Sequence, residues 1–455
     1  MSIIYKQDVF ENSIIDDFSK IAEKNNVINP LLYKKYHVKR GLRNENGTGV
    51  LVGLTGVGNV HGYKISKGNR IPDEGKLTYR GIDVEEIVNA SNEEKRFGFE
   101  EVIYLLLFGE LPSRIQLSIF EKIIGECREL PENFTEDMIL KFPSNNIMNK
   151  LQRTILAAYS FDTNPDDIST KNLLRQSIEL IARVPTMIAH AYQAKIHYYD
   201  KKSLVIHSPR KDLSTAENIL YMIRPDNKYS KIEAEILDLA LIIHAEHGGG
   251  NNSAFATHVV SSTGTDTYSA IAAAVGSLKG PKHGGANIKV VDMMKNIKLN
   301  VNEWDNKKKI RRYLLKILKK EAFDHSGLIY GMGHAVYTLS DPRSVLLKKK
   351  ALELAKEKQR VDEFILYKNI EEISKEIFKE IRGYDAITAN VDLYSGFVYD
   401  MLNIPSDLYT PIFAVARTPG WCAHRIEQIL SEFKIIRPAY MNIKKEEKYT
   451  SLNKR

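Results

Sequence analysis

Apolar residues recur every three or four positions along most of this chain, which is the period of a helix with one buried face. Lys231–Glu246 shows the pattern well, because Ile232, Ile236, Leu239 and Ile243 are spaced by four, three and four. We predict a helix there, and the same periodicity over other segments predicts a chain made mainly of helices.

Signals for helix ends support two further helices. Thr265 or Asp266 can cap a helix that ends at Gly280-Pro281, because glycine tolerates the C-terminal turn and proline cannot continue the hydrogen-bond ladder. The stretch 343–383 is predicted to be further helix, ending on Arg-Gly.

Strand signals are confined to the N-terminal region. The Val- and Gly-rich stretch Thr48–Ile65 predicts a hairpin or two, and no alternation of strands with helices indicates a doubly wound α/β fold. Gly53, Gly56 and Gly58 lack the Lys-Ser/Thr that follows a phosphate-binding loop, so we interpret them as turn glycines of a hairpin. The expected class is all-α with a minor N-terminal β-hairpin.

Composition limits the class of protein without naming a function. A chain of 455 residues can form a large domain with a smaller companion, and a net charge of +8 favours anionic partners. Only two cysteines, Cys127 and Cys422, indicate reduced thiols in an intracellular compartment. We expect no signal peptide, no membrane-spanning segment and a cytoplasmic location.

A possible metal site is His244-Ala-Glu246-His247, with His258 as a third ligand. The zincin pattern places its two histidines four residues apart with a glutamate directly after the first, and neither condition is met here. We interpret the pair as polar histidines at a helix end and expect no metal.

The basic segment Asn306–Lys320 is a candidate nucleic-acid site. Its apolar residues fall at helical spacing, at Ile310, Leu314, Ile317 and Leu318. This spacing, without aromatic interleaving, favours a solvated basic face on an amphipathic helix over a nucleic-acid-binding surface.

Three glycine-rich segments each carry a histidine or an aspartate: His283 in Gly280–Asn287, His334 in Gly331–Arg343 and Asp392 in Asn390–Gly396. Each segment alone is more typical of a turn than of a catalytic site. Together they offer two hydrogen-bond donors and one carboxylate base without a metal. That set suits proton abstraction beside a carbonyl, where the base removes the proton and a donor stabilises the enol.

These segments, read in order along the chain, closely resemble the citrate synthase family. The matching positions are His247, Gly-Pro-Lys-His283-Gly-Gly-Ala-Asn287, Gly-His334 with Asp341-Pro-Arg343, Asn390-Val-Asp392 with Ser395-Gly396, Arg417 and Arg437-Pro438. The separation of twenty between Arg417 and Arg437 also matches, as does the segment Glu74–Gly81. The resemblance runs from about Thr48 to Pro438.

The resemblance implies an acyltransferase of the tricarboxylic acid cycle that condenses acetyl-CoA with oxaloacetate. Asp392 would take a proton from the acetyl-CoA methyl group, and His283 would donate a hydrogen bond to the thioester oxygen of the enol. His334 would polarise the oxaloacetate ketone and protonate the new alkoxide. Hydrolysis of citryl-CoA would release citrate and CoA, with acetyl-CoA as cosubstrate and no permanently bound cofactor.

The resemblance also implies binding residues and a partner. Guanidinium groups pair bidentately with carboxylates, and the residues matching the oxaloacetate site are His247, Arg343, Arg417 and Arg437. Arg437 would reach the site of the neighbouring subunit, which implies a homodimer, with no nucleic-acid or membrane partner. The backbone at Gly331 and Gly333 resembles the loop that holds CoA.

Two positions depart from family arginines, because this chain has Thr338 and Gln193 there. The CoA phosphate contacts are therefore unassigned. Mapped by motif, the family's large helical domain would comprise residues 1–285 and 402–455. A smaller helical domain, 286–401, would be inserted near the C-terminus and close on substrate.

Three rival functions remain open. A 2-methylcitrate synthase would use propionyl-CoA with the same residues, and one methylene is worth only about 1–3 kcal/mol of discrimination. A basic helical nucleic-acid-binding protein would use Asn306–Lys320. A metal hydrolase would use His244 and His247 and lose activity on chelation.

Overall fold

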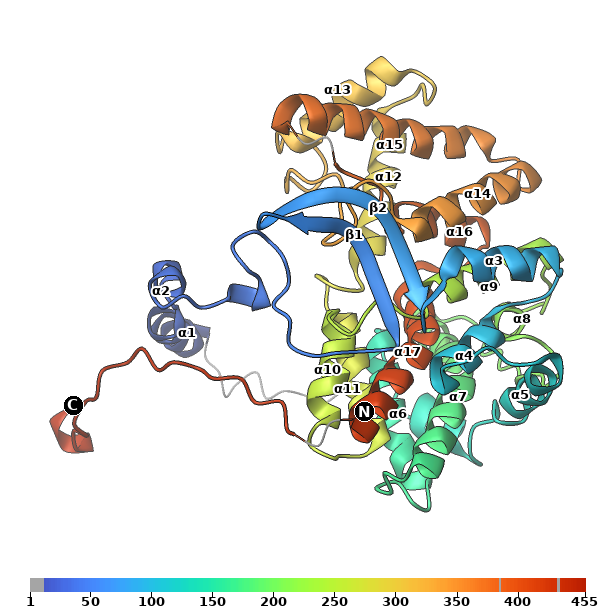
Figure 1. The fold of residues 1–455 in the computed structure, drawn as a ribbon, viewed down its shortest axis with the longest axis horizontal. Helices are drawn as coiled ribbons and strands as arrows, with labels where there is room; N and C mark the ends of the chain where they lie inside the picture. The colour runs from blue at the N-terminus through green and yellow to red at the C-terminus, as the bar shows by residue number, and fades with distance from the viewer. Residues whose placement is uncertain (1–11, 384–385, 432–433) are drawn as a thin grey trace. The chain divides into compact units, whose positions relative to one another are not determined.

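The structure, a computed structural model, describes residues 12–383, 386–431 and 434–455. Within these ranges it contains seventeen α-helices and one three-stranded sheet (Figure 1). The predicted all-α class with a minor N-terminal β-hairpin is confirmed. None of the described helices combines the length and apolar content needed to cross a membrane.

The chain divides into two compact units, Met1–Gly53 with Ser66–Arg70 and Leu54–Ile65 with Ile71–Arg455. The described part of the first unit contains α1 (Asn12–Asn26), α2 (Pro30–Lys35) and the 3-10 turn η2 (Arg40–Leu42).

The second unit holds the remaining helices. They are α3 (Val84–Glu93), α4 (Phe99–Phe108), α5 (Arg114–Glu126), α6 (Ile147–Ala158), α7 (Thr170–Tyr198), α8 (Thr215–Ile223), α9 (Lys231–His244), α10 (Asn252–Ser261), α11 (Thr267–Lys279), α12 (Ala286–Asn300), α13 (Lys307–Leu318), α14 (Pro342–Glu357), α15 (Val361–Arg382), α16 (Asp392–Met401) and α17 (Tyr409–Ser431). Short 3-10 or π turns are η3 (Thr135–Leu140), η4 (Tyr159–Phe161), η5 (Ser406–Leu408) and η6 (Leu452–Lys454).

The strands begin later than the sequence predicts. They are β1 (Gly58–Ser66), β2 (Asn69–Tyr79) and β3 (Ile82–Asp83), in the order β1-β2-β3. Gly53 and Gly56 precede β1, so their interpretation as hairpin turn glycines was wrong. The turn between β1 and β2 is Lys67-Gly68, where both residues have the positive φ that such a tight turn requires. Gly58 instead permits close packing, because a Cβ there would lie 2.6 Å from Cγ of Glu246.

The predicted helices are confirmed with one change. In α11 the Asp266 carboxylate accepts the Ser269 N–H at 2.7 Å as the N-cap, and Gly280 is the C-cap, as predicted. The stretch 343–383 forms two helices, α14 and α15, rather than one. Gln359 between them has a φ of 54°, and this left-handed residue reverses the chain so that α15 packs against α14.

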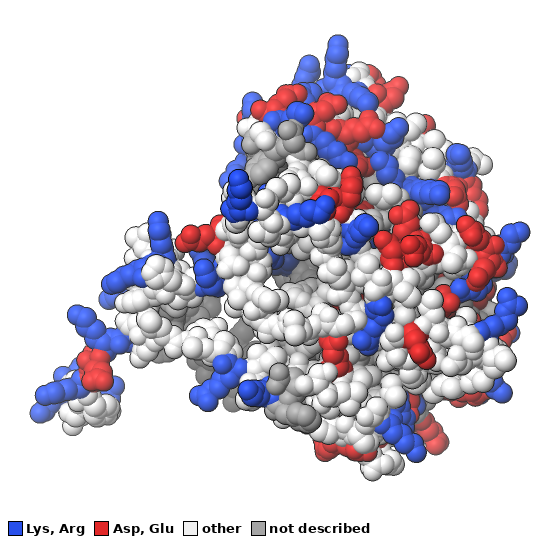
Figure 2. Space-filling view, in the orientation of Figure 1, with Lys and Arg blue, Asp and Glu red and all other residues white. Residues whose placement is uncertain are grey.

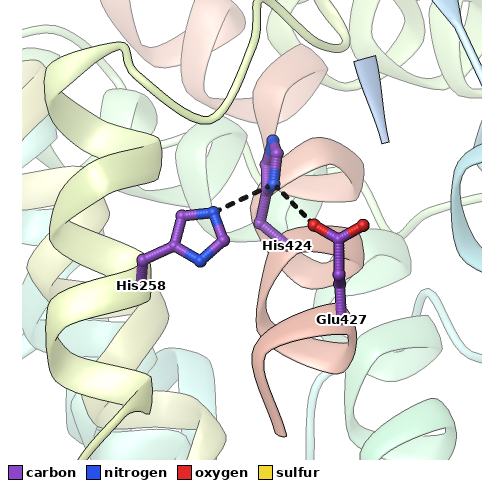
Figure 3. A group of neighbouring side chains, drawn as sticks. All are labelled: His258, His424 and Glu427. Carbon is purple, nitrogen blue, oxygen red and sulfur yellow. Dashed lines mark hydrogen bonds and ion pairs between the residues drawn. The ribbon is translucent and has the colours of Figure 1, made fainter. Parts of the chain in front are cut away.

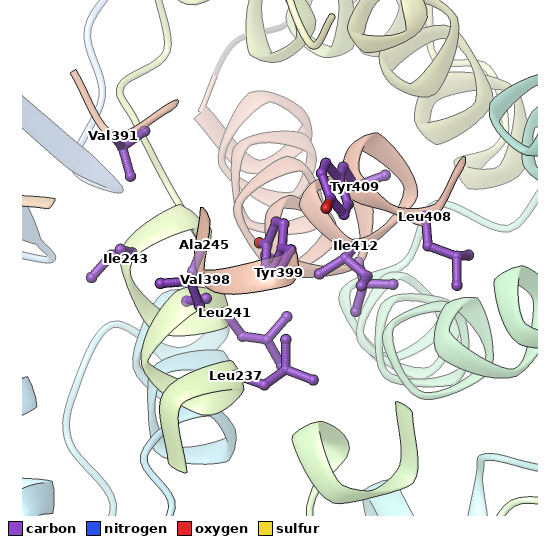
Figure 4. Packing of buried hydrophobic residues seen from close by; sticks show 14 of the residues in the cluster. Leu237, Leu241, Ile243, Ala245, Val391, Val398, Tyr399, Leu408, Tyr409 and Ile412 are labelled. Carbon is purple, nitrogen blue, oxygen red and sulfur yellow. The ribbon is translucent and has the colours of Figure 1, made fainter. Parts of the chain in front are cut away.

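The core is organised around α17, which packs against α4, α7, α9, α10 and α11. Its Ile412 belongs to one buried apolar cluster with Leu237 and Leu241 of α9, part of which Figure 4 shows. Tyr399 of α16 lies in the same cluster. A well-packed scaffold of this kind can hold side chains from distant segments in fixed positions.

Helices α12 to α16 pack on one another through the pairs α12–α16, α14–α16, α13–α15 and α14–α15. Helix α14 also packs against α9, and α12 against α17. The division into residues 1–285 with 402–455 and residues 286–401 stays a prediction.

Helix α13 is amphipathic, as the sequence predicts, with Ile310, Leu314 and Ile317 buried. Its basic residues have acidic partners on α15, because Lys307 lies 2.7 Å from Glu372 and Arg311 pairs with Glu380. Figure 2 accordingly shows acidic and basic side chains interleaved over α13 and α15. The solvated-face interpretation is supported over a nucleic-acid surface.

Candidate active site

The glycine-rich loop before His334 is fastened to the segment that leads into α16. The Gly333 N–H donates to the Thr388 carbonyl at 2.8 Å, and the Asn390 N–H donates to the Gly331 carbonyl at 2.9 Å. The Asn390 side chain adds a bond to the Gly333 carbonyl at 2.9 Å. Both glycines have φ near 90°, a conformation that L side chains rarely adopt. The segments that carry His334 and Asp392 are therefore positioned together.

The hydrogen bonds of His334 define its proton position. Its Nδ1 accepts the backbone N–H groups of Val336 and Tyr337, both at 3.1 Å. The neutral ring must then carry its proton on Nε2. The ring stacks on Tyr337, with centroids 4.7 Å apart. His334 thus offers a fixed Nε2–H donor.

His247 lies edge-on to His334, with ring centroids 5.2 Å apart. Its Nε2 is buried and has no hydrogen-bond partner among the described residues. Burial, with the positive charge of Arg343, lowers the pKa of His247 well below its usual value. The ring is therefore neutral, and its buried nitrogen is available to a ligand.

Arg343 is clamped by Asp341 at the start of α14. Arg343 Nε and Nη2 donate to the two Asp341 carboxylate oxygens at 3.0 and 2.7 Å. Both side chains are buried, and although burial opposes the charge, Asp341 raises the pKa of Arg343 above its usual value. The guanidinium also lies over the Tyr337 ring at 5.4 Å. Asp341 is thus a positioning residue for Arg343.

Arg417 projects from α17 and is also buried. Its Nε donates to the His244 carbonyl at 2.6 Å, whereas Nη2 is buried without a partner among the described residues. Burial lowers the pKa of Arg417 to about 10, so the group stays charged at neutral pH. A buried guanidinium donor without a partner suits an anionic ligand.

Asp392 is the first residue of α16, where its N–H donates to the Asn390 side chain at 3.0 Å. The glycine-rich segment around Asp392 is therefore not a simple turn, because it begins a new helix. Burial raises the pKa of Asp392 to about 6, with Arg343 opposing and Asp341 adding to the rise. A carboxyl of this pKa can act as a base near neutral pH.

His283 lies in the turn between α11 and α12, and its Nε2 is 3.0 Å from Ser253 Oγ of α10. Trp421 of α17 donates its indole N–H to the same hydroxyl at 3.1 Å. Burial, and then Arg417, lower the pKa of His283 to about 4, so the ring is neutral. Ser253 and Trp421 could not be predicted from the sequence, because only the packing of α10 against α17 brings them to His283.

Most of the predicted site residues lie close enough to affect one another's pKa. Arg343, Arg417 and His334 each lower the pKa of His247, and Arg343 lowers that of Asp392. Arg437 differs, because it is exposed on the extended segment that follows α17.

Two departures from the family pattern have structural contacts here. The Thr338 hydroxyl donates to the carbonyls of Gly62 and Asp73, which fastens the His334 loop to the β1–β2 hairpin. Gln193 is buried in α7, where its side chain donates to the Ile223 carbonyl at 3.3 Å. In Glu74–Gly81, the Tyr79 hydroxyl donates to the Ile242 carbonyl at 2.8 Å.

The metal set considered from the sequence does not assemble. His244 Nδ1 bonds to the Ala240 carbonyl of its own helix at 2.6 Å. Among the described residues, the group of potential ligands close enough to share an ion is instead His258, His424 and Glu427 (Figure 3). His244 and His247 do not belong to it.

The fold and the site define an all-α enzyme that pairs a carboxyl base with neutral histidine donors and buried arginines. The family model for the citrate synthase C-terminal domain matches residues 47–439, and the chain belongs to the citrate synthase family.

Named relatives agree with this assignment. A citrate synthase from Synechocystis sp. is 37% identical over 81% of this chain and 85% of its own length. A 2-methylcitrate synthase from Corynebacterium glutamicum is 32% identical over 83% of this chain and 92% of its own length. The crystal structure of citrate synthase from Thermotoga maritima superposes with a TM-score of 0.71 at 30% identity, covering 92% of this chain and 99% of that one. The chain is therefore an acyltransferase of a family that uses acetyl-CoA as a substrate and needs no permanent cofactor.

Proposed function

We propose that this chain condenses acetyl-CoA with oxaloacetate to form citrate and CoA. The observation that carries the proposal is the pairing of Asp392, whose pKa is raised to about 6, with neutral histidine donors beside buried arginines. A base of this strength, a hydrogen-bond donor for an enol and cations for two carboxylates are the groups that this condensation needs.

In the first step Asp392 takes a proton from the acetyl-CoA methyl group, and the electrons move to the thioester oxygen. His283 donates a hydrogen bond to that oxygen from Nδ1. The Ser253 hydroxyl supports this tautomer: since Trp421 donates to its oxygen, the hydroxyl proton can be given to Nε2 of His283. The neutral ring is a suitable donor, because it stabilises the enol without adding a charge.

In the second step the enol carbon attacks the ketone carbon of oxaloacetate. His334 polarises the ketone through its Nε2–H and protonates the alkoxide as it forms. Arg343, Arg417 and His247 hold the two carboxylates, with Arg417 Nη2 as one open donor. Water then cleaves the thioester of citryl-CoA and gives citrate, with the sulfur leaving as the CoA thiol.

We infer further that the active enzyme is a homodimer in which Arg437 completes the oxaloacetate site of the neighbouring subunit. Its exposure on a segment beyond α17 is compatible with contact to a second chain. We also assign CoA binding to the backbone at Gly331 and Gly333, and closure to movement of residues 286–401. The cytoplasmic location stays a prediction.

A thiol-release assay with oxaloacetate and either acetyl-CoA or propionyl-CoA tests the function. We expect faster turnover with acetyl-CoA and no loss of activity on chelation. Faster propionyl turnover would favour 2-methylcitrate synthase, the activity named for the Corynebacterium relative. No thiol release with either substrate would contradict the proposal.

A further inference from the structure

A cluster of two histidines and a glutamate lies between α10 and α17. His258 projects from α10, and His424 and Glu427 lie three residues apart on one face of α17 (Figure 3). His258 Nε2 is 3.2 Å from His424 Nδ1, which is 3.9 Å from Glu427 Oε1. One potential ligand atom from each residue lies within 4.8 Å of the others. The proposed reaction uses none of the three.

In the neutral form of each histidine, the outward hydrogen bond leaves the inner nitrogen without a proton. His258 Nδ1 bonds to the Gln428 side-chain oxygen at 2.8 Å, so with the amide oriented as in the structure this nitrogen carries the proton. His424 Nε2 likewise donates to the wholly buried Glu246 at 3.0 Å. In the neutral rings two nitrogen lone pairs therefore lie 3.2 Å apart, and a proton or a cation shared between them would stabilise this arrangement.

Glu427 supplies the third potential ligand atom of the cluster, a carboxylate oxygen. Its Oε2 accepts the Gly56 N–H at 2.7 Å, whereas its Oε1 is buried and has no hydrogen bond among the described residues. An imidazole bonded outward to a carboxylate or amide oxygen, and a carboxylate held by a backbone N–H, are the outer contacts that orient metal ligands. The outer contacts of the cluster thus hold three donor atoms within 4.8 Å of one another.

We propose that His258, His424 and Glu427 form a binding site for one divalent transition-metal ion of the zinc type. Two imidazole nitrogens and one carboxylate oxygen suit Zn²⁺, which takes nitrogen ligands at about 2.0–2.1 Å and so places tetrahedral neighbours about 3.3 Å apart. The two histidine nitrogens already have nearly this spacing. Glu427 Oε1, which is 3.9 Å from His424 Nδ1, must move inward to reach this spacing.

The fourth ligand position is open to water or to the Thr55 hydroxyl, which lies 3.5 Å from His424 Nδ1. The charged groups around the site are the carboxylates of Glu246 and Glu427, and Arg80 and Arg417, which interact with Glu246.

The proposed ion would link α10 to α17 and stabilise the fold rather than take part in condensation. The metal-free expectation for the reaction is unaffected, because none of the three ligands is a proposed catalytic or substrate-binding residue. The ion would stabilise the fold because it binds the folded chain and not the unfolded one.

Titration of the chelator-treated full-length chain with Zn²⁺ tests the site, and Co²⁺ serves as a spectroscopic probe. We expect one ion per chain and a Tm increase of about 2 °C or more. We also expect Co²⁺ bands typical of tetrahedral coordination. Thiol-release activity should persist after chelation.

His258→Gln and Glu427→Gln should each weaken Zn²⁺ binding by about 100-fold or more and abolish the metal-induced rise in Tm. His325→Gln is the matched control for surface binding, since His325 is exposed and lies outside the cluster. Tm without metal reports whether each variant folds. The proposal is overturned if the wild-type chain binds no stoichiometric Zn²⁺, or if folded His258→Gln and Glu427→Gln bind as the wild type does. Either outcome would assign the space between the histidines to a shared proton.

Discussion

The catalytic role proposed for Asp392 depends on its ionisation, because only the ionised carboxylate can accept a proton. An unperturbed aspartate has a pKa of about 3.9, and burial raises that of Asp392 to about 6. As the pH falls through this value the base becomes protonated, so kcat/KM should decline with a midpoint near pH 6. A pH–rate profile checks this, and activity that stays level down to about pH 4.5 would contradict the shift.

Replacing Asp392 with asparagine removes the base while keeping its shape. Asp392→Asn should lower kcat by about 10²- to 10⁴-fold, because the amide cannot accept the methyl proton. Thiol release gives the rate, and circular dichroism checks the fold. Asp400→Asn is the matched control, since Asp400 is an exposed aspartate on the same helix, paired with Arg360. Equal losses in both variants would argue against a base.

Arg417 tests whether its unpaired donor binds substrate. Lysine keeps the charge but loses the planar fork, the bond from Nε to the His244 carbonyl and the Nη2 donor. Arg417→Lys should raise KM for oxaloacetate about 10- to 100-fold, the value of one or two charge-assisted hydrogen bonds. Steady-state kinetics at saturating acetyl-CoA measure it, and an unchanged KM would remove Arg417 from the oxaloacetate site.

Gly396 acts at the scale of helices, where α16 packs against α12. A Cβ at this position would lie 2.6 Å from Val291 Cγ2 and 2.9 Å from Asn287 Oδ1. Gly396→Ala should therefore destabilise the fold by about 1–3 kcal/mol through overpacking. Urea unfolding measures the change. Gly53→Ala is the control, because nothing lies within 4 Å of a Cβ there and its effect should be small. Similar losses in both would contradict the packing argument.

The packing of α16 against α12 also explains why part of the sequence motif has the residues it has. Asn287 donates its side-chain amide to the Ser395 hydroxyl, next to Gly396. These three motif residues thus join α12 to α16, and their position in the motif does not require contact with substrate.

A shared active site is a prediction about the whole molecule, and mixed dimers test it. If Arg437 serves the neighbouring subunit, a dimer of one Arg437→Ala chain and one Asp392→Asn chain has one complete site. Co-refolded chains in equal amounts should therefore recover about a quarter of wild-type activity, since half of the dimers are mixed. Each variant alone should be inactive. If Arg437 serves its own chain, the mixture stays inactive.

Local features of the sequence determined the fold class. Helix periodicity and caps such as Asp266 depend on residues a few positions apart, so α9 and α11 follow from short windows. The order of the motifs along the chain identified His283, His334 and Asp392 as candidate site residues. Local pattern predicted the ends of helices and strands less well. The left-handed Gln359 divides a predicted helix into two, and β1 begins later than predicted.

Packing between distant segments decided what the side chains can do. The support of His283 by Ser253 and Trp421 joins α10, α17 and the turn before α12, and the donors of the proposed metal site join α10 to α17. The raised pKa of Asp392 depends on how completely neighbouring helices exclude water. The sequence by itself thus determined the helices, the family resemblance and the residue types of the site. Only the tertiary structure decided their proton positions, charges and open donors, because desolvation and long-range hydrogen bonds exist only once the helices pack.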